Sequence, residues 1–330
     1  MAFAHALSPA PCGKTYRARC VRAPAKSARP GRVRVSASAP SSFDRLGDVE
    51  STSLITSFWR ARESEKDEET RLVYDESARL IRDSLMSKEQ IAKLESSAIL
   101  ELATDLLAIR SHVIDELIDS RFGIKDKKGE HHLYYQMVHL GIGMCTRHYT
   151  RLKNLPKNAT VFEIDSNEVL EARVDVLDLL GCPPKCIIEP VPCADVGVEF
   201  ALLEALAYKG YRADLPTIFV AEGLLEYMSP EQLDAMFGSI ARIAADGSMF
   251  IAQVLEPSII DEFRRLDPEM SIPFQNIPPR EQILSHMNAE ADVWHEVEFL
   301  PYDDLGRKLG RPVPHVGNIL TALFEYKDEE

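Results

Sequence analysis

The stretch Tyr135-Gln-Met-Val-His-Leu-Gly-Ile-Gly-Met-Cys-Thr-Arg147 combines a short apolar segment, a Gly-x-Gly turn and the start of a helical pattern. Because neither Gly141 nor Gly143 has a Cβ, a ligand can approach the backbone closely at such a turn. The next apolar segment, Ala159-Thr-Val-Phe-Glu-Ile-Asp165, ends in an acid roughly 20 residues further on, the spacing at which nucleotide-binding α/β folds hold ribose hydroxyls. The stretch therefore predicts a strand–turn–helix unit that binds a nucleoside.

The turn lacks the features that bind a pyrophosphate. A dinucleotide fingerprint would have a third glycine where Thr146 stands, and the chain has no complete Gly-x-x-x-x-Gly-Lys-Ser/Thr phosphate loop. These absences favour a nucleoside ligand without a pyrophosphate. S-adenosyl-L-methionine (SAM) is the common ligand of that kind.

Composition and charge exclude several classes of protein. The 330 residues include 38 Lys+Arg against 52 Asp+Glu, and the formal net charge of −14 argues against a nucleic-acid partner, which needs a basic face. The longest apolar runs, such as Thr217-Ile-Phe-Val-Ala221, are far too short to span a membrane. With 45% hydrophobic residues, the chain fits one large α/β domain with additions. Nothing in the sequence predicts an oligomeric state.

The N-terminal segment has a different composition from the rest of the chain. Residues 1–43 contain no Asp or Glu but eight basic residues amid Ala, Ser and Pro. We expect residues 1–40 to be an organellar transit peptide, with a disordered basic tail as the alternative. Because Val33–Ala39 resembles a plastid-type processing region, we expect the chloroplast stroma rather than the mitochondrion. Without the eight basic residues, the rest of the chain has 30 basic and 52 acidic residues, a charge of −22.

The hydrophobic periodicity divides the remainder into a helical section, residues 51–130, and a core, residues 131–330. In the core, strand-like and helical segments alternate, which predicts an α/β fold with a mostly parallel sheet covered on both faces. The predicted strands are Tyr135–Leu140, Ala159–Ile164, Lys185–Val191, Pro216–Ala221 and Ser248–Val254. The predicted helices are Ser51–Arg62, Tyr74–Leu85, Lys88–Ile109, Ser111–Ile118, Glu168–Leu180, Val198–Tyr208 and Pro230–Ile243.

The C-terminal part predicts a closing antiparallel pair. Leu266–Arg280 contains four prolines and reads as an irregular connection that could cover a site as a lid. Trp294–Phe299 and Ile319–Tyr326 then follow as the paired strands.

Acidic and sulfur-containing residues near the predicted strand ends are candidates for a site. Glu222 follows the fourth strand, where ligands of open α/β sheets bind, and a buried glutamate there needs a charged or hydrogen-bonded partner. The amino group of SAM would be a suitable partner. The spacing of Cys182, Cys186 and Cys193 resembles that of metal ligands, but no fourth ligand lies nearby. We therefore expect buried free thiols rather than a metal site.

With these features in place, the sequence resembles the leucine carboxyl methyltransferase family, a group of SAM-dependent methyltransferases. The resemblance runs from about Ser51 to the end of the chain as an ordered set of short motifs. The central motifs are Leu140-Gly-Ile-Gly-Met-Cys-Thr-Arg147, Phe162-Glu-Ile-Asp165, Cys193-Ala-Asp195 and Ala221-Glu-Gly-Leu-Leu-Glu-Tyr-Met228. The upstream blocks are Trp59-Arg-Ala-Arg-Glu-Ser64, Val73-Tyr-Asp-Glu-Ser-Ala78 and Ile109-Arg-Ser-His-Val-Ile-Asp115.

The resemblance implies a seven-stranded, Rossmann-like sheet with an N-terminal helical section and SAM as the cofactor. It also implies a set of cofactor contacts. It assigns no catalytic residue and implies no metal. The matched residues are Arg110 for the methionine carboxylate, Gly141 and Gly143 for the turn beneath the methionine moiety, Asp165 for the ribose, Asp195 for the adenine and Glu222 for the amino group. Cys145 departs from the family pattern Gly-x-Asp-Thr-Arg, which leaves a loss of cofactor binding open.

Each matched residue also has a purely structural alternative. Asp165 could be the N-cap of the helix that follows, and Arg110 could be a solvated helix residue. Arg147 and Arg151 could face the substrate or be surface charges. His139 is expected to be a hydrogen-bonded core residue.

The resemblance implies an O-methyltransferase that acts on a carboxylate or hydroxyl of a small metabolite. A protein C-terminal carboxylate and a non-catalytic SAM-binding protein are the alternatives. A carboxylate needs only positioning, whereas a hydroxyl needs a base. Because no matched position supplies a base, we expect a carboxylate, while Glu226 and Tyr227 border the site without an assigned role.

Overall fold

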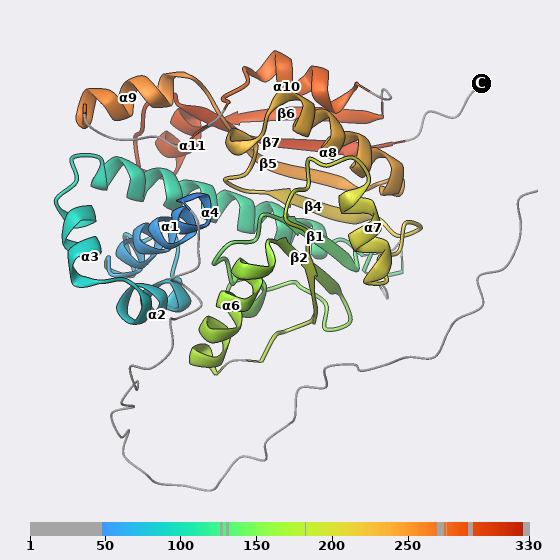
Figure 1. The fold of residues 1–330 in the computed structure, drawn as a ribbon, viewed down its shortest axis with the longest axis horizontal. Helices are drawn as coiled ribbons and strands as arrows, with labels where there is room; N and C mark the ends of the chain where they lie inside the picture. Colours follow the sequence, from blue (N-terminus) through green and yellow to red (C-terminus); the bar gives the residue numbers. More distant parts are fainter. Residues whose placement is uncertain are drawn as a thin grey trace, which may run out of the picture. The chain divides into compact units, whose positions relative to one another are not determined.

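The computed structural model describes residues 48–125, 128–129, 132–181, 183–268, 274, 276–289 and 293–325 (Figure 1). All of these residues lie within one compact unit, Pro40–Glu330. The predicted transit peptide lies outside the described residues, and so does part of the proline-containing connection 266–280.

Seven strands within the described residues form a single sheet in the order β3-β2-β1-β4-β5-β7-β6 (Figure 1). The strands are β1 (Gln136–Leu140), β2 (Thr160–Asp165), β3 (Ile187–Pro192), β4 (Thr217–Ala221), β5 (Met249–Leu255), β6 (Trp294–Pro301) and β7 (Gly317–Phe324). The first five strands in this order pair in parallel, whereas β7 is antiparallel to both β5 and β6. The predicted fold class and the closing antiparallel pair are confirmed. The order reverses at β1, which lies between β2 and β4, and such a switch point is where open α/β sheets bind ligands.

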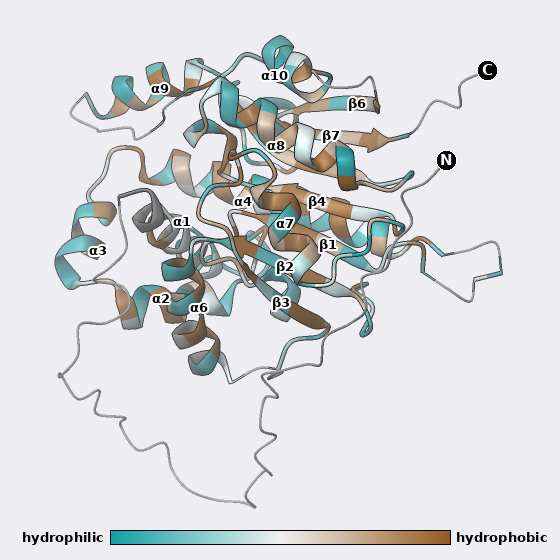
Figure 2. Ribbon diagram, turned by 45° about the vertical axis from the view of Figure 1, so that its right-hand side comes forward, coloured by the Kyte–Doolittle hydropathy of each residue, from teal (hydrophilic) through white to brown (hydrophobic). Residues whose placement is uncertain are grey.

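Helices cover both faces of the sheet, so the central strands β1, β4 and β5 are buried along their whole length, whereas the outer strand β3 is largely exposed. The helices are α1 (Asp48–Ser64), α2 (Glu76–Leu85), α3 (Lys88–Glu95), α4 (Leu100–Phe122), α5 (Arg147–Thr150), α6 (Asn167–Leu180), α7 (Ala201–Tyr208), α8 (Pro230–Ile243), α9 (Ser258–Leu266), α10 (Arg280–Met287) and α11 (Tyr302–Lys308). Val138 and Phe219 of the sheet belong to a hydrophobic core shared with α7, α8 and α10. Met137 and Ile218 belong to a second core, shared with α4, α9 and α11. Figure 2 shows the apolar strands β1 and β4 between these layers.

Two predicted helical segments are wrong in their bounds. The predicted helix Lys88–Ile109 is two helices, because the chain leaves α3 at Ser96 and enters α4 at Leu100. The Ser96 hydroxyl bonds to the Lys93 carbonyl at 3.0 Å, and serines commonly compete with the helix backbone in this way. The predicted helix Ser111–Ile118 is the middle of α4. Short helices α9, α10 and α11 were not predicted.

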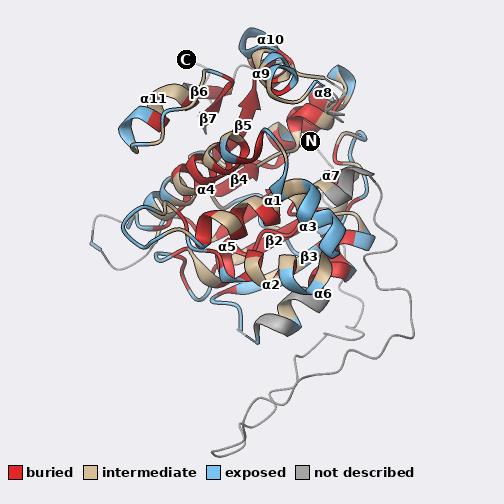
Figure 3. Cartoon of the chain, turned by 90° about the vertical axis from the view of Figure 1, so that its left-hand side faces the viewer, coloured by how far each residue is buried: buried red, intermediate tan, exposed pale blue. Residues whose placement is uncertain are grey.

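The N-terminal helices are attached directly to the strand–turn–helix unit. Helix α1 packs against α2 and α4, and Arg60 of α1 donates a 3.2 Å hydrogen bond to the Met144 carbonyl beyond the Gly-x-Gly turn. Helix α4 lies largely buried, whereas α3 is exposed at the surface (Figure 3). The helical section is therefore part of the wall of the candidate site.

Candidate functional site

The Gly-x-Gly turn is held tightly in the structure. Gly141 and Gly143 have φ angles of 62° and 49°, which side-chain-bearing residues rarely adopt. An added Cβ would lie 3.2 Å from Leu224 Cδ1 at Gly141 and 3.1 Å from Ser53 Cβ at Gly143. Both the backbone conformation and the close neighbours therefore require glycine here, and α1 covers the turn through Ser53.

Asp165 lies beside this turn at the end of β2. Its carboxylate accepts hydrogen bonds from the backbone N–H groups of Gly143 and Ser166, both at 2.8 Å. The side chain that caps α6 is that of Ser166, which accepts from Val169 at 3.3 Å. The alternative role of Asp165 as the N-cap of this helix is therefore wrong. The acid instead ties the turn after β1 to the end of β2.

Asp195 lies in the loop that follows β3. One carboxylate oxygen accepts from the Gly197 N–H and the other from the Gln232 side-chain amide, both at 2.8 Å. Gln232 belongs to the capping box of α8, and a Cβ at Gly197 would lie 2.4 Å from its Cβ. Asp195 is thus positioned by α8, at the same edge of the sheet as Asp165.

Arg110 and Glu222 form an ion pair across the switch point of the sheet. Arg110 lies in the middle of α4, and its Nε is 2.7 Å from a carboxylate oxygen of Glu222, which follows β4. Arg110 Nη1 also donates to the Gln253 side-chain oxygen at 2.5 Å. The arginine is only 6% exposed, so its alternative as a solvated helix residue is wrong. An Arg–Glu pair of this kind is complementary to a zwitterionic amino acid. The arginine can bind the carboxylate of the ligand, and the glutamate can bind its ammonium group.

Glu222 has a second cationic partner in Arg147. The Arg147 guanidinium donates to the other carboxylate oxygen of Glu222 and is fully buried. Burial raises the pKa of Glu222, but the guanidinium groups of Arg147 and Arg110 outweigh it and hold that pKa well below its usual range. Glu222 is therefore ionised at neutral pH. Arg147 Nη1 is buried and has no hydrogen-bond partner among the described residues.

Further ion pairs connect this pair to the N-terminal helices. Arg147 lies 3.2 Å from Asp115, which in turn lies 2.6 Å from Arg151. Arg151 reaches Asp75 at 2.5 Å, and Asp75 also pairs with Arg60 at 3.1 Å. The alternative of Arg147 and Arg151 as surface charges is wrong, because both side chains are buried in this ion-pair chain. The spacing of the motifs carries no signal for these long-range partners.

A second buried ion pair, between Arg173 and Glu163, stabilises the Gly-x-Gly turn. Arg173 of α6 donates to the carbonyls of Gly143 and Cys145 at 2.8 and 2.7 Å, and its guanidinium pairs with Glu163 at 2.5 Å. His148 contacts the same carboxylate at 2.6 Å. Cys145, which stands where the family has Asp, is buried and lies with its Sγ 3.3 Å from Arg147 Nε. The loop therefore keeps its arginine contact without a carboxylate at this position.

Other predictions about single residues have mixed outcomes. Cys186 and Cys193 are free and buried, as expected, whereas Cys182 lies outside the described residues. His139 is buried, but its Nδ1 has no hydrogen-bond partner among the described residues, contrary to expectation. In the part of the chain that the structure describes, no group of His, Cys, Asp or Glu is arranged to hold a metal, and no helix is long and apolar enough to cross a membrane.

Glu226 is a further site residue to which the sequence assigned no role. It lies in the short 3-10 helix η2 (Leu225–Tyr227), four residues after Glu222, and is 5% exposed. Burial raises the pKa of its carboxyl to about 7. Only its position within the motif Ala221–Met228 could have indicated it in advance.

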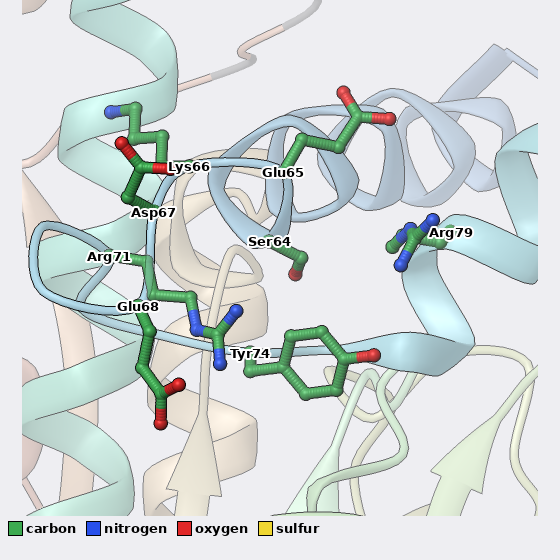
Figure 4. A pocket seen from close by; sticks show the side chains of 8 residues that line it. All are labelled: Ser64, Glu65, Lys66, Asp67, Glu68, Arg71, Tyr74 and Arg79. Carbon is green, nitrogen blue, oxygen red and sulfur yellow. The ribbon is translucent and has the colours of Figure 1, made fainter.

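An open hollow on the outer surface is separate from these residues. It has a volume of about 520 Å³ and lies where the chain passes from α1 to α2. Its lining residues are Ser64, Glu65, Lys66, Asp67, Glu68, Arg71, Tyr74 and Arg79 (Figure 4). The Arg71 guanidinium lies 4.6 Å from the centre of the Tyr74 ring. Because its lining charges are of both signs and none is a predicted site residue, the hollow is not the candidate site.

The fold is an α/β fold whose candidate site lies at the carboxyl ends of β1, β2, β3 and β4. A sequence profile of the leucine carboxyl methyltransferase family matches residues 53–241. That match covers more than half of the chain, and the chain belongs to this family. The resemblance predicted from the motifs is confirmed.

Curated relatives and a solved structure are similar to this chain. A Mycobacterium avium protein named "Putative S-adenosyl-L-methionine-dependent methyltransferase" is 31% identical over 64% of this chain and 65% of its own. A Mycobacterium sp. (strain KMS) protein of the same name is 29% identical over 72% and 77%. The first match thus spans just under two thirds of its relative. A crystal structure described as a "putative methyltransferase" from Thermobifida fusca has a TM-score of 0.50 at 17% identity, covering 82% of this chain and 95% of its own. That likeness supports the fold.

Proposed function

We propose that this protein is a SAM-dependent O-methyltransferase that methylates a carboxylate or hydroxyl oxygen of a small metabolite. The observation that carries the proposal is the buried Arg110–Glu222 pair beside the Gly-x-Gly turn, in a chain of this family. The names of the curated relatives support the cofactor.

The residues of the site fit SAM by their chemistry. Arg110 would hold the methionine carboxylate and Glu222 its ammonium group, so that the ligand replaces the ion pair between them. Asp165 and Asp195 would accept hydrogen bonds from the ribose and the adenine amino group. Bound SAM supplies an electrophilic methyl group, and the chain's own task is to align an acceptor oxygen with it.

The surroundings of the ion pair favour a small acceptor. Glu226 and Tyr302 lie near Arg110 and Glu222, and both are buried. A folded protein would need an open groove to deliver its C-terminal carboxylate to such a place.

A ligand-stabilisation measurement tests the proposal. S-adenosylhomocysteine (SAH) and SAM should raise the melting temperature of the chain without its first 40 residues, since a ligand that binds only the native state stabilises it. NAD should not. No shift at millimolar SAM would contradict the proposal.

A variant series tests the assignment of residues. Asp165→Ala should weaken SAH binding by roughly 1.5–3 kcal/mol, the usual range for hydrogen bonds to a charged group. Glu222→Ala should weaken it through the amino group. Glu189→Ala, which removes a partly exposed acid elsewhere on the sheet, is the control. Unchanged SAH affinity in Asp165→Ala would show that the ribose assignment is wrong.

We also propose that the protein works in the chloroplast stroma. The acid-free, basic composition of residues 1–43 supports this location. Residues 1–43 fused to a fluorescent protein should direct it to plastids. Delivery to mitochondria, or retention outside both organelles, would refute it.

A further inference from the structure

The carboxyl group of Glu226 is placed among polar atoms that already have other partners. A Cβ built on Gly223 would lie 3.5 Å from Arg110 Nη1 and 3.9 Å from side-chain oxygens of both Gln253 and Glu226. These three side chains therefore converge on one face of Gly223, whose φ of 68° is adopted readily by glycine. The convergence forms a small polar compartment next to the Arg110–Glu222 pair.

One carboxyl oxygen of Glu226, the buried Oε2, has no hydrogen-bond partner among the described residues. The Arg110 guanidinium instead pairs with Glu222 and donates to Gln253. A buried carboxyl oxygen without a partner is unfavourable, and unsatisfied atoms of this kind are uncommon unless they have a role.

A neighbouring tyrosine has the same unusual property. Tyr302 is 1% exposed, and its hydroxyl makes no hydrogen bond to any described residue. Burial raises the pKa of Tyr302 and outweighs the opposing charge of Arg110, so its hydroxyl stays protonated. Two unpartnered buried oxygens beside one ion pair indicate that a polar group of a ligand completes the compartment.

We propose that Glu226 accepts the proton of a hydroxyl-bearing methyl acceptor, so that the substrate is an alcohol or phenol. This inference rests on the proposed function. The acceptor's O–H proton moves to the Glu226 carboxylate while its oxygen lone pair forms the bond to the methyl carbon. The carbon–sulfur bond breaks with its electron pair on sulfur, which yields SAH and a methyl ether. The protonated glutamate then releases its proton to water.

The state of Glu226 suits this step. Because burial raises the pKa of its carboxyl to about 7, an ionised fraction exists at neutral pH and is a stronger base than an ordinary carboxylate. An ionised carboxylate acceptor would need no base. Glu226 is thus the base that the family-matched positions lack.

The first test measures the proton on Glu226 directly. In the SAH complex, infrared difference spectra between the parent and Glu226→Gln should show a protonated carboxyl band that disappears as pH rises through about 7. Glu231→Gln, which changes an exposed acid at the start of α8, should leave the band unchanged. Absence of the band at pH 5.5 would overturn the inference.

The second test identifies the product class without knowledge of the acceptor. The enzyme is incubated with methyl-tritiated SAM and a small-metabolite extract of its source cells. An ether keeps its label in mild alkali, whereas a methyl ester releases labelled methanol. Alkali-stable label, reduced at least about a hundredfold in Glu226→Gln, is expected from loss of a general base. Alkali-labile label would overturn the inference.

Cofactor binding separates this inference from the proposed function. The SAH-induced rise in melting temperature should be the same in the parent, Glu226→Gln and Glu231→Gln, and smaller in Glu222→Gln. If the parent shows no rise, the proposed function fails. If Glu226→Gln loses the rise as Glu222→Gln does, Glu226 is a cofactor contact and the inference about the base fails. If SAH binds but no alkali-stable label forms with any extract fraction, the inference about a hydroxyl acceptor fails.

Discussion

Glu226 is a buried acid whose ionisation opposes folding. Its pKa is raised to about 7 in the folded protein, against 4.5 for an ordinary glutamate, so its stabilising contribution is complete below about pH 4.5 and is lost as pH rises through 7. Replacement by neutral Gln removes this dependence. Relative to the parent, Glu226→Gln should therefore gain about 2 kcal/mol of unfolding free energy between pH 5 and pH 8.

Urea unfolding at both pH values measures this difference. Glu231→Gln is the matched control, because Glu231 is exposed. An unfolding free-energy difference between Glu226→Gln and the parent that is the same at pH 5 and pH 8 would show that Glu226 titrates normally.

Cys145 is a second residue with a local consequence. Its Sγ lies 3.3 Å from Arg147 Nε, where the family pattern has a carboxylate. Cys145→Asp should bring a negative charge to this buried guanidinium and keep or raise the melting temperature and the SAH affinity. Cys145→Ala is the control for loss of the thiol. An aspartate variant less stable than the alanine variant would show that the loop cannot accommodate the charge.

At the scale of elements, Asp75 joins α1 and α2 to α5. One carboxylate oxygen caps α2 through the Ala78 N–H at 3.0 Å, and the other pairs with Arg60 and Arg151. Asp75→Asn can keep the cap but removes the charge, so it should destabilise the protein by roughly 3–5 kcal/mol, as expected for breaking a buried ion pair. Asp75→Ala should lose about 1 kcal/mol more through the cap.

The control for this pair of variants is an acid on the same helix. Asp83 pairs with Arg82 at the surface and is 57% exposed, so Asp83→Asn should change the unfolding free energy by less than about 1 kcal/mol. Equal losses in Asp75→Asn and Asp83→Asn would contradict the ion-pair chain as the attachment of the N-terminal helices.

For the whole molecule, the buried ion pairs determine the response to acid. The guanidinium groups around Asp75, Glu163 and Glu222 outweigh burial and lower the pKa of each carboxyl, to about 2 for Glu163. Their contribution to stability is present above the ordinary values near 4 and is lost as pH falls towards the lowered ones.

The unfolding free energy should therefore fall steeply between about pH 4.5 and pH 2, with little dependence on salt because the pairs are shielded from solvent. Urea unfolding at a series of pH values, with and without added salt, measures both properties. A strong salt effect at pH 7 would show that surface charges dominate instead.

Local patterns in the chain were sufficient for the alternating strands and helices and for the Gly-x-Gly turn, whereas the family resemblance supplied the candidate cofactor residues. The strands of the parallel sheet are apolar runs bounded by turn residues, and the Gly141–Gly143 turn needs positive φ angles that glycine supplies. Helix α8 was predicted at its exact bounds, Pro230–Ile243, because Ser229 and Gln232 form a capping box around an N-terminal proline. These signals act over a few residues, so the sequence alone contains them.

The charge partners were decided only by the tertiary structure. Arg147 pairs with Asp115 and Glu222, which lie 32 residues before it and 75 residues after it in the chain, so no local spacing predicts either contact. In the sequence, Glu226 is one of several acids that follow a strand. Only the structure shows that its Oε2 has no hydrogen-bond partner among the described residues, because Arg110 contacts Gln253 and Glu222 instead. The sequence determined which residues reach the switch point of the sheet. Packing determined which of these charges form ion pairs, because pairing depends on distance. Packing also raised the pKa of the Glu226 carboxyl, because burial disfavours its charged form.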